Sequence, residues 1–396
     1  MKSPAGSLQR DRSLVPNVGV FERRSQAFQN RLAPGNFRAN KENLAIRTSL
    51  SSIRQVILLV VSASLLSAQT SSWVFAGSDG HLHYRTDGQG NRIMDFSWAG
   101  YKSGGVPLPT VSVQQTLSPS GGDDTSAIQN AINAVSALPL DGNGFRGALL
   151  LAAGTFNISR QLNINGSGVV LRGSGSGSGG TTIDMTGTTG FLAISVTGSG
   201  SRSTSNTANI TDSYVPAGTN TLNVDNTAGF NVGDTVVINR VATSAWIHFM
   251  GMDTLTHGGV PQTWISPGST FHTDRVIAAI SGNTITVDAP ITDSFDATYL
   301  GTPVGTISKY TWPTRISQSG VEHLRILAPV GTTVYSAIAM DNIIDGWIQD
   351  VVGQETQNAF DININAKQVT EDHVINNVTT TQTRSAGTAD FSINGT

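Results

Sequence analysis

The sequence predicts an all-β protein in which short strands stack as the coils of a parallel solenoid. After residue 100, Ser, Thr, Asn and Gly alternate with Val, Ile and Leu, and the chain has 43 glycines but only 13% charged residues. The apolar runs are short and are separated by turn residues, which leaves no room for crossover helices. Towards the C-terminus, corresponding runs recur at roughly 23–25 residues, a period typical of solenoid coils.

Composition and charge exclude several classes of function. The 396-residue chain contains no cysteine, which excludes disulfides and thiolate metal sites. Residues 1–54 carry ten Lys and Arg against three Asp and Glu, whereas the remaining residues carry fourteen against twenty-four. No nucleic-acid-binding module follows the basic segment, and the acidic remainder would repel phosphate backbones. We therefore expect no nucleic-acid partner.

The beginning of the chain predicts export. Arg54 precedes an apolar run over 56–66, and Ser67-Ala68-Gln69 follows it. This pattern indicates a signal peptide over 51–68, and hence a secreted, periplasmic or cell-surface protein that leaves the membrane after cleavage at Ala68. A buried core strand is the alternative. Residues 1–50 are rich in Arg, Asn, Ser and Gln, which predicts a disordered leader or a start codon assigned too early.

One segment predicts an α-helix. Over 124–138, apolar residues recur at helical spacing, and Asp124 stands where a side chain can accept hydrogen bonds from the first turn. Asp123 and Asp124 together also suggest a catalytic dyad or a metal site. Negative charge at the positive end of the helix dipole favours the capping role instead.

The coils that follow carry a resemblance. The segments GDDTSAIQNAINA, LLLAAGTFNIS and GVVLRGSGSGSGGTTI resemble the opening of pectate-lyase-like (pectin lyase fold) proteins, over roughly residues 95–185. The resemblance implies a right-handed parallel β-helix of bacterial origin, with an N-terminal capping helix and a polysaccharide substrate. The superfamily includes lyases, hydrolases, esterases and phage tailspikes, so the resemblance leaves the reaction open. The glycine run at 173–180 lacks the features of a phosphate loop and is expected to be a turn.

The middle of the chain predicts an inserted domain. Between 210 and 308 the period changes, and Ser281-Gly282-Asn283 joins two alternating runs in a hairpin pattern. A small antiparallel β-domain inserted into the solenoid explains both features. The predicted organisation is then a linker over 69–94, first coils over 95–209, the insertion over 210–308 and further coils over 309–396. We expect a truncated C-terminus, because no cap covers the last coil.

The insertion also holds a dense set of chemically capable residues. Indole rings stack on sugar faces, while His, Asp and Arg bond hydroxyls and carboxylates, so these residues are candidates for substrate binding. The alternative is a loop that packs its own aromatic residues. The spacing of the histidines matches no familiar metal site. The candidates are Trp246, His248, Asp253, His257, Trp264, His272, Asp274 and Arg275.

The last coils hold the candidate catalytic residues. They are His323, Arg325, Glu371, Asp372 and His373, in two runs two coils apart. Strand alternation places His323 and Arg325 on one face and Glu322 on the other, with Leu324. Solvated surface charges are the alternative reading of these residues. The family resemblance implies a basic residue that abstracts a proton, together with a possible Ca²⁺ cofactor.

These observations indicate an enzyme acting on a polysaccharide, either a uronate lyase or a glycoside hydrolase. A non-catalytic carbohydrate-binding or adhesive β-helix, like a tailspike or a surface protein, is the alternative. A purely structural solenoid of the cell envelope is a third. The sequence does not indicate an oligomeric state.

Overall fold

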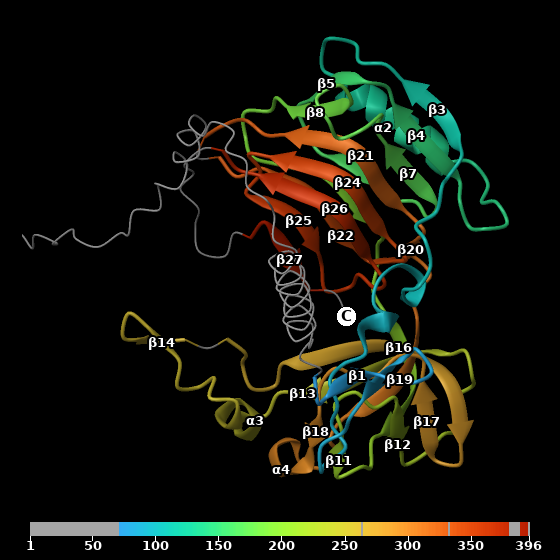
Figure 1. Ribbon diagram of the computed structural model, residues 1–396, viewed down its shortest axis with the longest axis vertical. Helices are drawn as coiled ribbons and strands as arrows, with labels where there is room; N and C mark the ends of the chain where they lie inside the picture. Colours follow the sequence, from blue (N-terminus) through green and yellow to red (C-terminus); the bar gives the residue numbers. More distant parts are fainter. Residues whose placement is uncertain (1–70, 263, 332, 380–388, 395–396) are drawn as a thin grey trace, which may run out of the picture. The chain divides into compact units, whose positions relative to one another are not determined.

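The computed structural model describes residues 71–262, 264–331, 333–379 and 389–394. The predicted leader (1–50) and signal peptide (51–68) lie outside these residues. Short strands dominate the described chain, as the sequence predicts (Figure 1). Within it, no helix is long and apolar enough to cross a membrane.

Two parallel sheets wind the chain into coils. The strands are β3 (Val113–Leu117), β4 (Gly147–Leu151), β5 (Gly154–Ile158), β6 (Leu162–Ile164), β7 (Val169–Arg172), β8 (Thr181–Met185), β9 (Leu192–Thr197), β21 (Gly320–Leu327), β22 (Ser336–Asp341), β24 (Trp347–Gln354), β25 (Asn358–Ile362), β26 (Thr370–Asn377) and β27 (Phe391–Ile393). One sheet runs β26-β24-β21-β7-β4-β3 with β8 and β5 joined at β21, and the other runs β27-β25-β22-β9-β6. A further parallel pair joins β20 (Ile316–Ser317) to β23 (Ile343–Ile344). This curled parallel arrangement fits a β-helix and confirms that part of the prediction.

The coils repeat at a nearly constant spacing. Gly320 pairs with Trp347, which pairs with Thr370, so corresponding positions recur after 27 and then 23 residues. Strands β21, β22, β24, β25 and β26 coincide with the apolar runs seen in the sequence. The period is slightly more variable than expected, because the turns differ in length.

Three coils bend at the same place. Val321 and Leu324 both belong to the buried core, so the alternation of β21 is broken between them. His323 makes the break, since its φ of 57° lies in the left-handed region. Asp350 and His373 hold the same position in β24 and β26, with φ of 49° and 52°. Asp and His tolerate this conformation better than most residues, which suits them to a corner.

The core lies inside the coils, and helix α2 (Thr125–Ser136) packs its apolar face into it through Ile128, Ile132 and Val135. The capping role predicted for Asp124 is wrong in detail. Asp124 precedes the helix but has helical φ/ψ of −88° and −4°, and it makes no capping bond. Its carboxylate instead accepts from the backbone N–H groups of Ser120 (3.0 Å) and Asn157 (3.2 Å).

Asp123 satisfies the start of α2 instead. Its carboxylate accepts from the backbone N–H of Thr125 at 2.9 Å and from the Ser159 hydroxyl at 2.7 Å. Asp123 and Asp124 therefore both hold the start of the helix in place. Neither carboxylate is left free for a catalytic pair.

The second part of the structure is a six-stranded antiparallel sheet with a hydrophobic core of its own. Its strands are β10 (Ser203–Asn209), β12 (Thr221–Asn223), β13 (Thr235–Val241), β16 (Thr270–Ser281), β17 (Thr284–Val287) and β19 (Thr306–Thr311). Ser281 pairs with Thr284, which confirms the predicted hairpin at this turn. Smaller elements are β11 (Tyr214–Val215), β14 (Thr256–His257), β15 (Val260–Pro261), β18 (Phe295–Asp296), α3 (Ser244–Phe249) and α4 (Ala297–Leu300). Ile238, Ile285 and Phe295 lie in the core.

Residues 94–112, here called the covering segment, pack on the outside of the coils. The segment follows the hairpin of β1 (Val74–Ala76) and β2 (Leu82–Tyr84), and it contains the 3₁₀ helices η1 (Phe96–Trp98) and η2 (Tyr101–Ser103). The Tyr101 ring meets Trp347 edge-on at 5.5 Å, and its backbone N–H donates to the Thr370 hydroxyl at 2.8 Å. The segment therefore covers the outer face where β24 and β26 begin.

Candidate functional site

The bend in the coils brings together four of the five predicted catalytic residues. Glu322, Gln349 and Asp372 align across β21, β24 and β26, and the bend residues follow each of them directly. Because neighbouring strands lie about 4.8 Å apart, side chains at these positions in adjacent coils are within reach of one another. We call the group of His323, Arg325, Asp350, Asp372 and His373 the corner site.

His323 is oriented by a carboxylate of the next coil. Its Nδ1 lies 3.0 Å from Asp350 Oδ2, and both side chains are about two-fifths exposed, at 40% and 41%. Ser176 donates to the other oxygen of Asp350 at 2.6 Å. Among the residues that the structure describes, the His323 Nε2 has no hydrogen-bond partner. A carboxylate-held imidazole with one free nitrogen is suited to accept or donate a proton.

The glycine run that looked like a turn helps to build this arrangement. Gly173 packs so closely that an added Cβ would lie 2.3 Å from the His323 carbonyl oxygen, so only glycine fits there. The turn that follows carries Ser176 to Asp350. Three coils thus contribute to one chain of hydrogen bonds.

Asp372 and His373 form the adjoining part of the corner site. The Gln349 amide donates to Asp372 Oδ2 at 3.0 Å, and His373 Nδ1 lies 2.6 Å from Asp372 Oδ1. The pKa of Asp372 is lowered most by the hydrogen bond from Gln349 and next by the bond with His373. Asp372 is therefore a carboxylate at neutral pH and not a general acid.

Arg325 supplies a positive charge without a carboxylate partner. Its Nε donates to the Ser176 carbonyl at 3.3 Å, and Nη1 donates to Gln354 Oε1 at 3.4 Å. No ion pair joins Arg325 to an acid within the described chain. An arginine in this state can accept a carboxylate from a ligand.

Beneath the corner site lies a buried ion pair. Glu322 is 2% exposed and pairs with Arg172, and its Oε2 accepts from Trp347 Nε1 at 2.9 Å. The Trp347 indole lies over Gly320, where an added Cβ would meet the ring at 2.2 Å. Simple alternation placed Glu322 on the same face as Leu324, and this is wrong because the bend at His323 intervenes: Leu324 lies in the apolar core, whereas Glu322 is buried outside it, against Arg172 and Trp347.

Glu371 is separated from the other predicted catalytic residues. It aligns with Val321 and Ile348, which point into the core, so its side chain faces away from Asp372. Burial, and then the charge of Asp361, raise the pKa of Glu371 to about 7. Its Oε1 is buried without a hydrogen-bond partner in the described part of the chain.

The predicted substrate-binding residues fall into exposed and buried groups. His248 and Asp253 pair at 2.8 Å on the surface, while His257 lies on the exposed strand β14 and Trp264 is 74% exposed. Trp246 is buried, with the Arg240 guanidinium 4.4 Å from its ring centre. His272 Nδ1 contacts Asn239 Oδ1 at 2.6 Å, and burial, followed by the charge of Arg202, lowers the His272 pKa.

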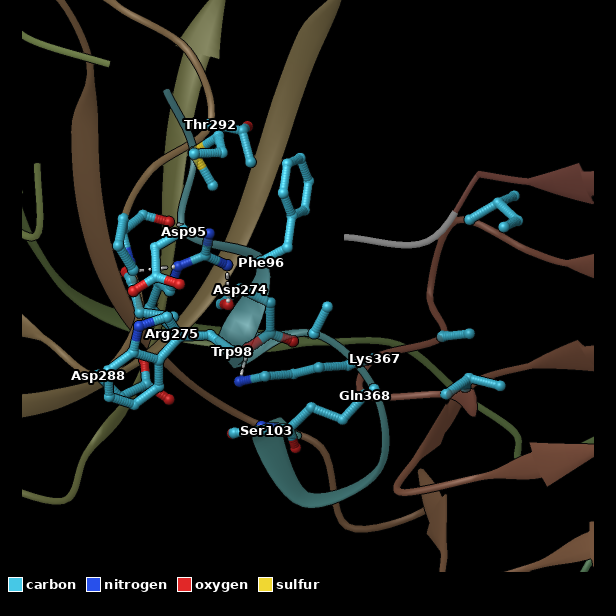
Figure 2. A pocket seen from close by; sticks show the side chains of 18 of the residues that line it. Asp95, Phe96, Trp98, Ser103, Asp274, Arg275, Asp288, Thr292, Lys367 and Gln368 are labelled. Atoms are coloured by element: carbon cyan, nitrogen blue, oxygen red, sulfur yellow. Dashed lines mark hydrogen bonds and ion pairs between the residues drawn. The ribbon is translucent and has the colours of Figure 1, made fainter. Parts of the chain in front are cut away.

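The remaining two, Asp274 and Arg275, lie in the wall of a cavity of about 460 Å³ (Figure 2). Asp274 is fully buried and binds Arg315 at 2.7 Å and Lys367 at 3.2 Å, as the dashed line to Lys367 indicates. Arg275 donates to the carbonyls of Ala289 (3.0 Å) and Pro290 (2.6 Å). Both side chains therefore hold neighbouring segments together.

The calcium site implied by the family resemblance does not fit these residues. Across the described ranges, no three His, Asp or Glu side chains gather in a way that could hold one metal ion.

Sequence reasoning missed Asp350, Ser176 and Gln349. Each is an ordinary polar residue in its own run, and only the register between coils brings it to the corner site. Aligning the coils by their bend residues would have found Asp350, because it takes the position of His323 and His373. Lys367, which pairs with Asp274 in the cavity wall, was also missed, because nothing in its own run of the sequence marks it.

No protein-family model matches the chain, and neither does any curated protein. The chain is similar in structure to the tailspike protein gp49 from Pseudomonas phage LKA1, at 15% identity and a TM-score of 0.37, over 69% of this chain and 44% of that one. The gp54 tailspike of Acinetobacter baumannii bacteriophage AP22, solved in complex with a capsular saccharide, matches at 13% identity, a TM-score of 0.28 and 64% and 48% coverage. The tailspike gp61 of Pseudomonas phage phi297 matches at 12% identity and a TM-score of 0.31, over 64% of this chain and 42% of that one. The chain spans less than half the length of each structure.

Proposed function

We propose that this protein is an exported, pectate-lyase-like enzyme that cleaves a uronate-containing polysaccharide at the corner site. One observation carries the proposal: the 3.0 Å contact between His323 Nδ1 and Asp350, which leaves the other imidazole nitrogen free on the surface. The neighbouring Arg325 supports it, because a β-elimination requires a cation to hold the uronate carboxylate while a base removes the adjacent proton.

The chemistry follows from these two groups. Arg325 binds the carboxylate, which favours the negative charge that develops when the adjacent C–H bond breaks. His323 Nε2 takes that proton, and its positive charge is stabilised by Asp350. The electron pair forms the C4–C5 double bond as the glycosidic C4–O bond breaks. The leaving oxygen takes a proton from solvent, so the products are one unsaturated and one ordinary chain end.

Asp372 and His373 complete the surface on which the sugar chain would lie. Carboxylate and imidazole groups bond sugar hydroxyls, and both side chains are exposed on β26, two coils from His323. Glycoside hydrolysis is less well supported, because it needs a protonated carboxylic acid, and the corner site holds Asp372 in its ionised form.

Saccharide binding without cleavage is the second candidate. It is favoured by the exposed residues Trp264 and Phe249, which lie in the segment between β13 and β16 and are 74% and 58% exposed. Such aromatic rings present apolar faces to sugars.

For the architecture we infer that α2 caps the first coil and that residues 203–311 form an inserted β-domain.

A polysaccharide panel tests the proposal. The full-length chain is incubated with polygalacturonate, alginate, hyaluronan and neutral glucans, and ultraviolet absorbance of unsaturated products is followed together with reducing ends. The proposal predicts absorbance and reducing ends in equal amounts with at least one uronate polymer. Reducing ends without absorbance would show hydrolysis, and neither signal in the presence of measurable binding would support the second candidate. Either of these two results would contradict the proposed lyase activity.

A further inference from the structure

A row of outward side chains runs beside the corner site, across the strands β5, β8, β21, β24 and β26 (Figure 1). Ile183, Ile326 and Val351 lie in the core, so the side chains next to them along their strands point away from it. Neighbouring coils lie about 4.8 Å apart, which is close to the length of one sugar unit, so a glycan crossing the coils can place one sugar over each. We call this set the arginine row, and its members pair in the order Thr155, Thr182, Arg325, Val352 and Ile375.

The outer face around the arginine row holds a single fixed cation. Arg325 is the one lysine or arginine on these five strands. His323 and His373 are each paired with an aspartate, so neither pair carries a net positive charge. A carboxylate on the sugar over Arg325 is therefore neutralised, whereas a carboxylate on the adjoining sugar would meet no cation and would lie near like charges. The acidic side chains that share this face are Asp184, Asp350 and Asp372.

The two sides of the arginine row offer different chemistry. Thr155 and Thr182 carry hydroxyl groups, which exchange hydrogen bonds with sugar hydroxyls. Val352 and Ile375 carry none, and Ile375 is 50% exposed. Covering an exposed isoleucine with a methyl group is favourable, whereas covering it with a hydroxyl or a carboxylate leaves that polar group without a partner. The side formed by β24 and β26 therefore favours a sugar with a methyl group in place of the hydroxymethyl group or the carboxylate.

We propose that the corner site takes a heteropolysaccharide in which each uronate is flanked by neutral sugars, with a 6-deoxyhexose on the side of Val352 and Ile375. The inference rests on the proposed function, because it places the glycan at the corner site with its uronate on Arg325. A polymer that carries a carboxylate on every sugar is the disfavoured ligand.

Calorimetric titration with two hexasaccharides tests the proposal. One is hexagalacturonate, with a carboxylate on every sugar, and the other alternates galacturonate with rhamnose, a 6-deoxyhexose. The titrated protein is the full chain with His323→Asn, because asparagine tolerates the left-handed bend and cannot act as the base in cleavage. We expect the alternating hexasaccharide to bind at least about tenfold more tightly. Equal or weaker binding of the alternating hexasaccharide, or no binding of either, would overturn the proposal.

Variants at Ile375 locate the preference. Ile375→Lys supplies a cation for a second carboxylate and should strengthen the binding of hexagalacturonate about tenfold. Ile375→Ser removes the apolar contact and should weaken the binding of the alternating hexasaccharide about threefold, with hexagalacturonate unchanged. Ile93→Lys is the matched control, because Ile93 is 47% exposed and lies outside the arginine row. An equal gain with both lysine variants would mean that net charge sets the preference, and would contradict the role of the row.

Cleavage of the same two hexasaccharides is scored separately, with the unaltered protein. Preferential binding of the alternating hexasaccharide without unsaturated products would contradict the lyase and leave the preference standing. Faster formation of unsaturated products from hexagalacturonate than from the alternating hexasaccharide would overturn the preference and leave the lyase standing.

Discussion

His323 and Asp350 lie in successive coils, 27 residues apart in sequence, with Nδ1 and Oδ2 separated by 3.0 Å. The contact exists because both residues occupy the left-handed bend of their strands. A bend that looks like a structural necessity of the coil thus presents an oriented imidazole on the outer face.

Asp350→Asn tests whether that contact serves catalysis. The amide keeps the size of the side chain but cannot stabilise a charged imidazole, so we expect kcat to fall about 10–100-fold with little change in KM. Steady-state kinetics on the best substrate measures both constants. An unchanged kcat would show that Asp350 is only a bend residue.

The bend positions also show how far the sequence predicts this protein. The strands β21, β24 and β26 could be predicted because Val, Ile and Leu recur in short runs, and the burial of the inward side chains follows from alternation. His323 breaks that alternation, so faces assigned by simple alternation on one side of the bend do not carry over to the other. Conformations of this kind depend on the pairing of coils and leave little trace in a single run.

Residues of the candidate site illustrate the same limit. His323, Arg325, Asp372 and His373 could be proposed from residue type, and the register brings them together. Asp350 and Ser176 could not, because their contacts span 27 and 174 residues. The buried ion pair of Arg172 and Glu322 spans 150 residues and was equally invisible.

Glu371 should weaken the fold at high pH. The pKa of Glu371 is raised to about 7 by burial and by Asp361, so the folded state disfavours the ionised form. Folding stability is therefore lost as pH rises from the ordinary pKa of a glutamate through that raised value. Replacing Glu371 by Val, the residue type at the aligned position 321, removes this loss.

We expect Glu371→Val to increase the free energy of unfolding by about 1 kcal/mol at pH 8, after allowance for partial solvent screening, and by much less at pH 4. Urea denaturation followed by circular dichroism at both pH values measures the difference. An equal gain at the two pH values would mean that packing, and not ionisation, causes it.

Asp274 should be essential to stability. Asp274→Asn leaves Arg315 and Lys367 buried without their counter-charge, which we expect to cost about 3 kcal/mol. Burial alone would raise the pKa of Asp274, but the charges of Lys367 and Arg315 outweigh it and lower the pKa. The stabilisation is therefore present at neutral pH and lost only as pH falls through the acidic range.

Thermal denaturation of Asp274→Asn across this pH range measures the effect. The difference from the unaltered protein should be largest at neutral pH and should shrink on acidification. Asp253→Asn, at an exposed pair with His248, is the control and should change the free energy of unfolding by less than about 1 kcal/mol. A loss of equal size for both variants would contradict the role of the buried charges.

The most direct test of the account compares two histidines that each pair with an aspartate. His323 pairs through Nδ1 with Asp350 and His83 pairs through Nε2 with Asp79, both at 3.0 Å and both partly exposed, but only His323 leaves Nε2 free beside Arg325 on the coils. With the best substrate of the polysaccharide panel, His323→Ala should lower the rate at which unsaturated products form by at least about 100-fold. His83→Ala should leave that rate unchanged. Full activity of His323→Ala, with the fold intact by circular dichroism, would contradict the assignment of the corner site as the place of cleavage.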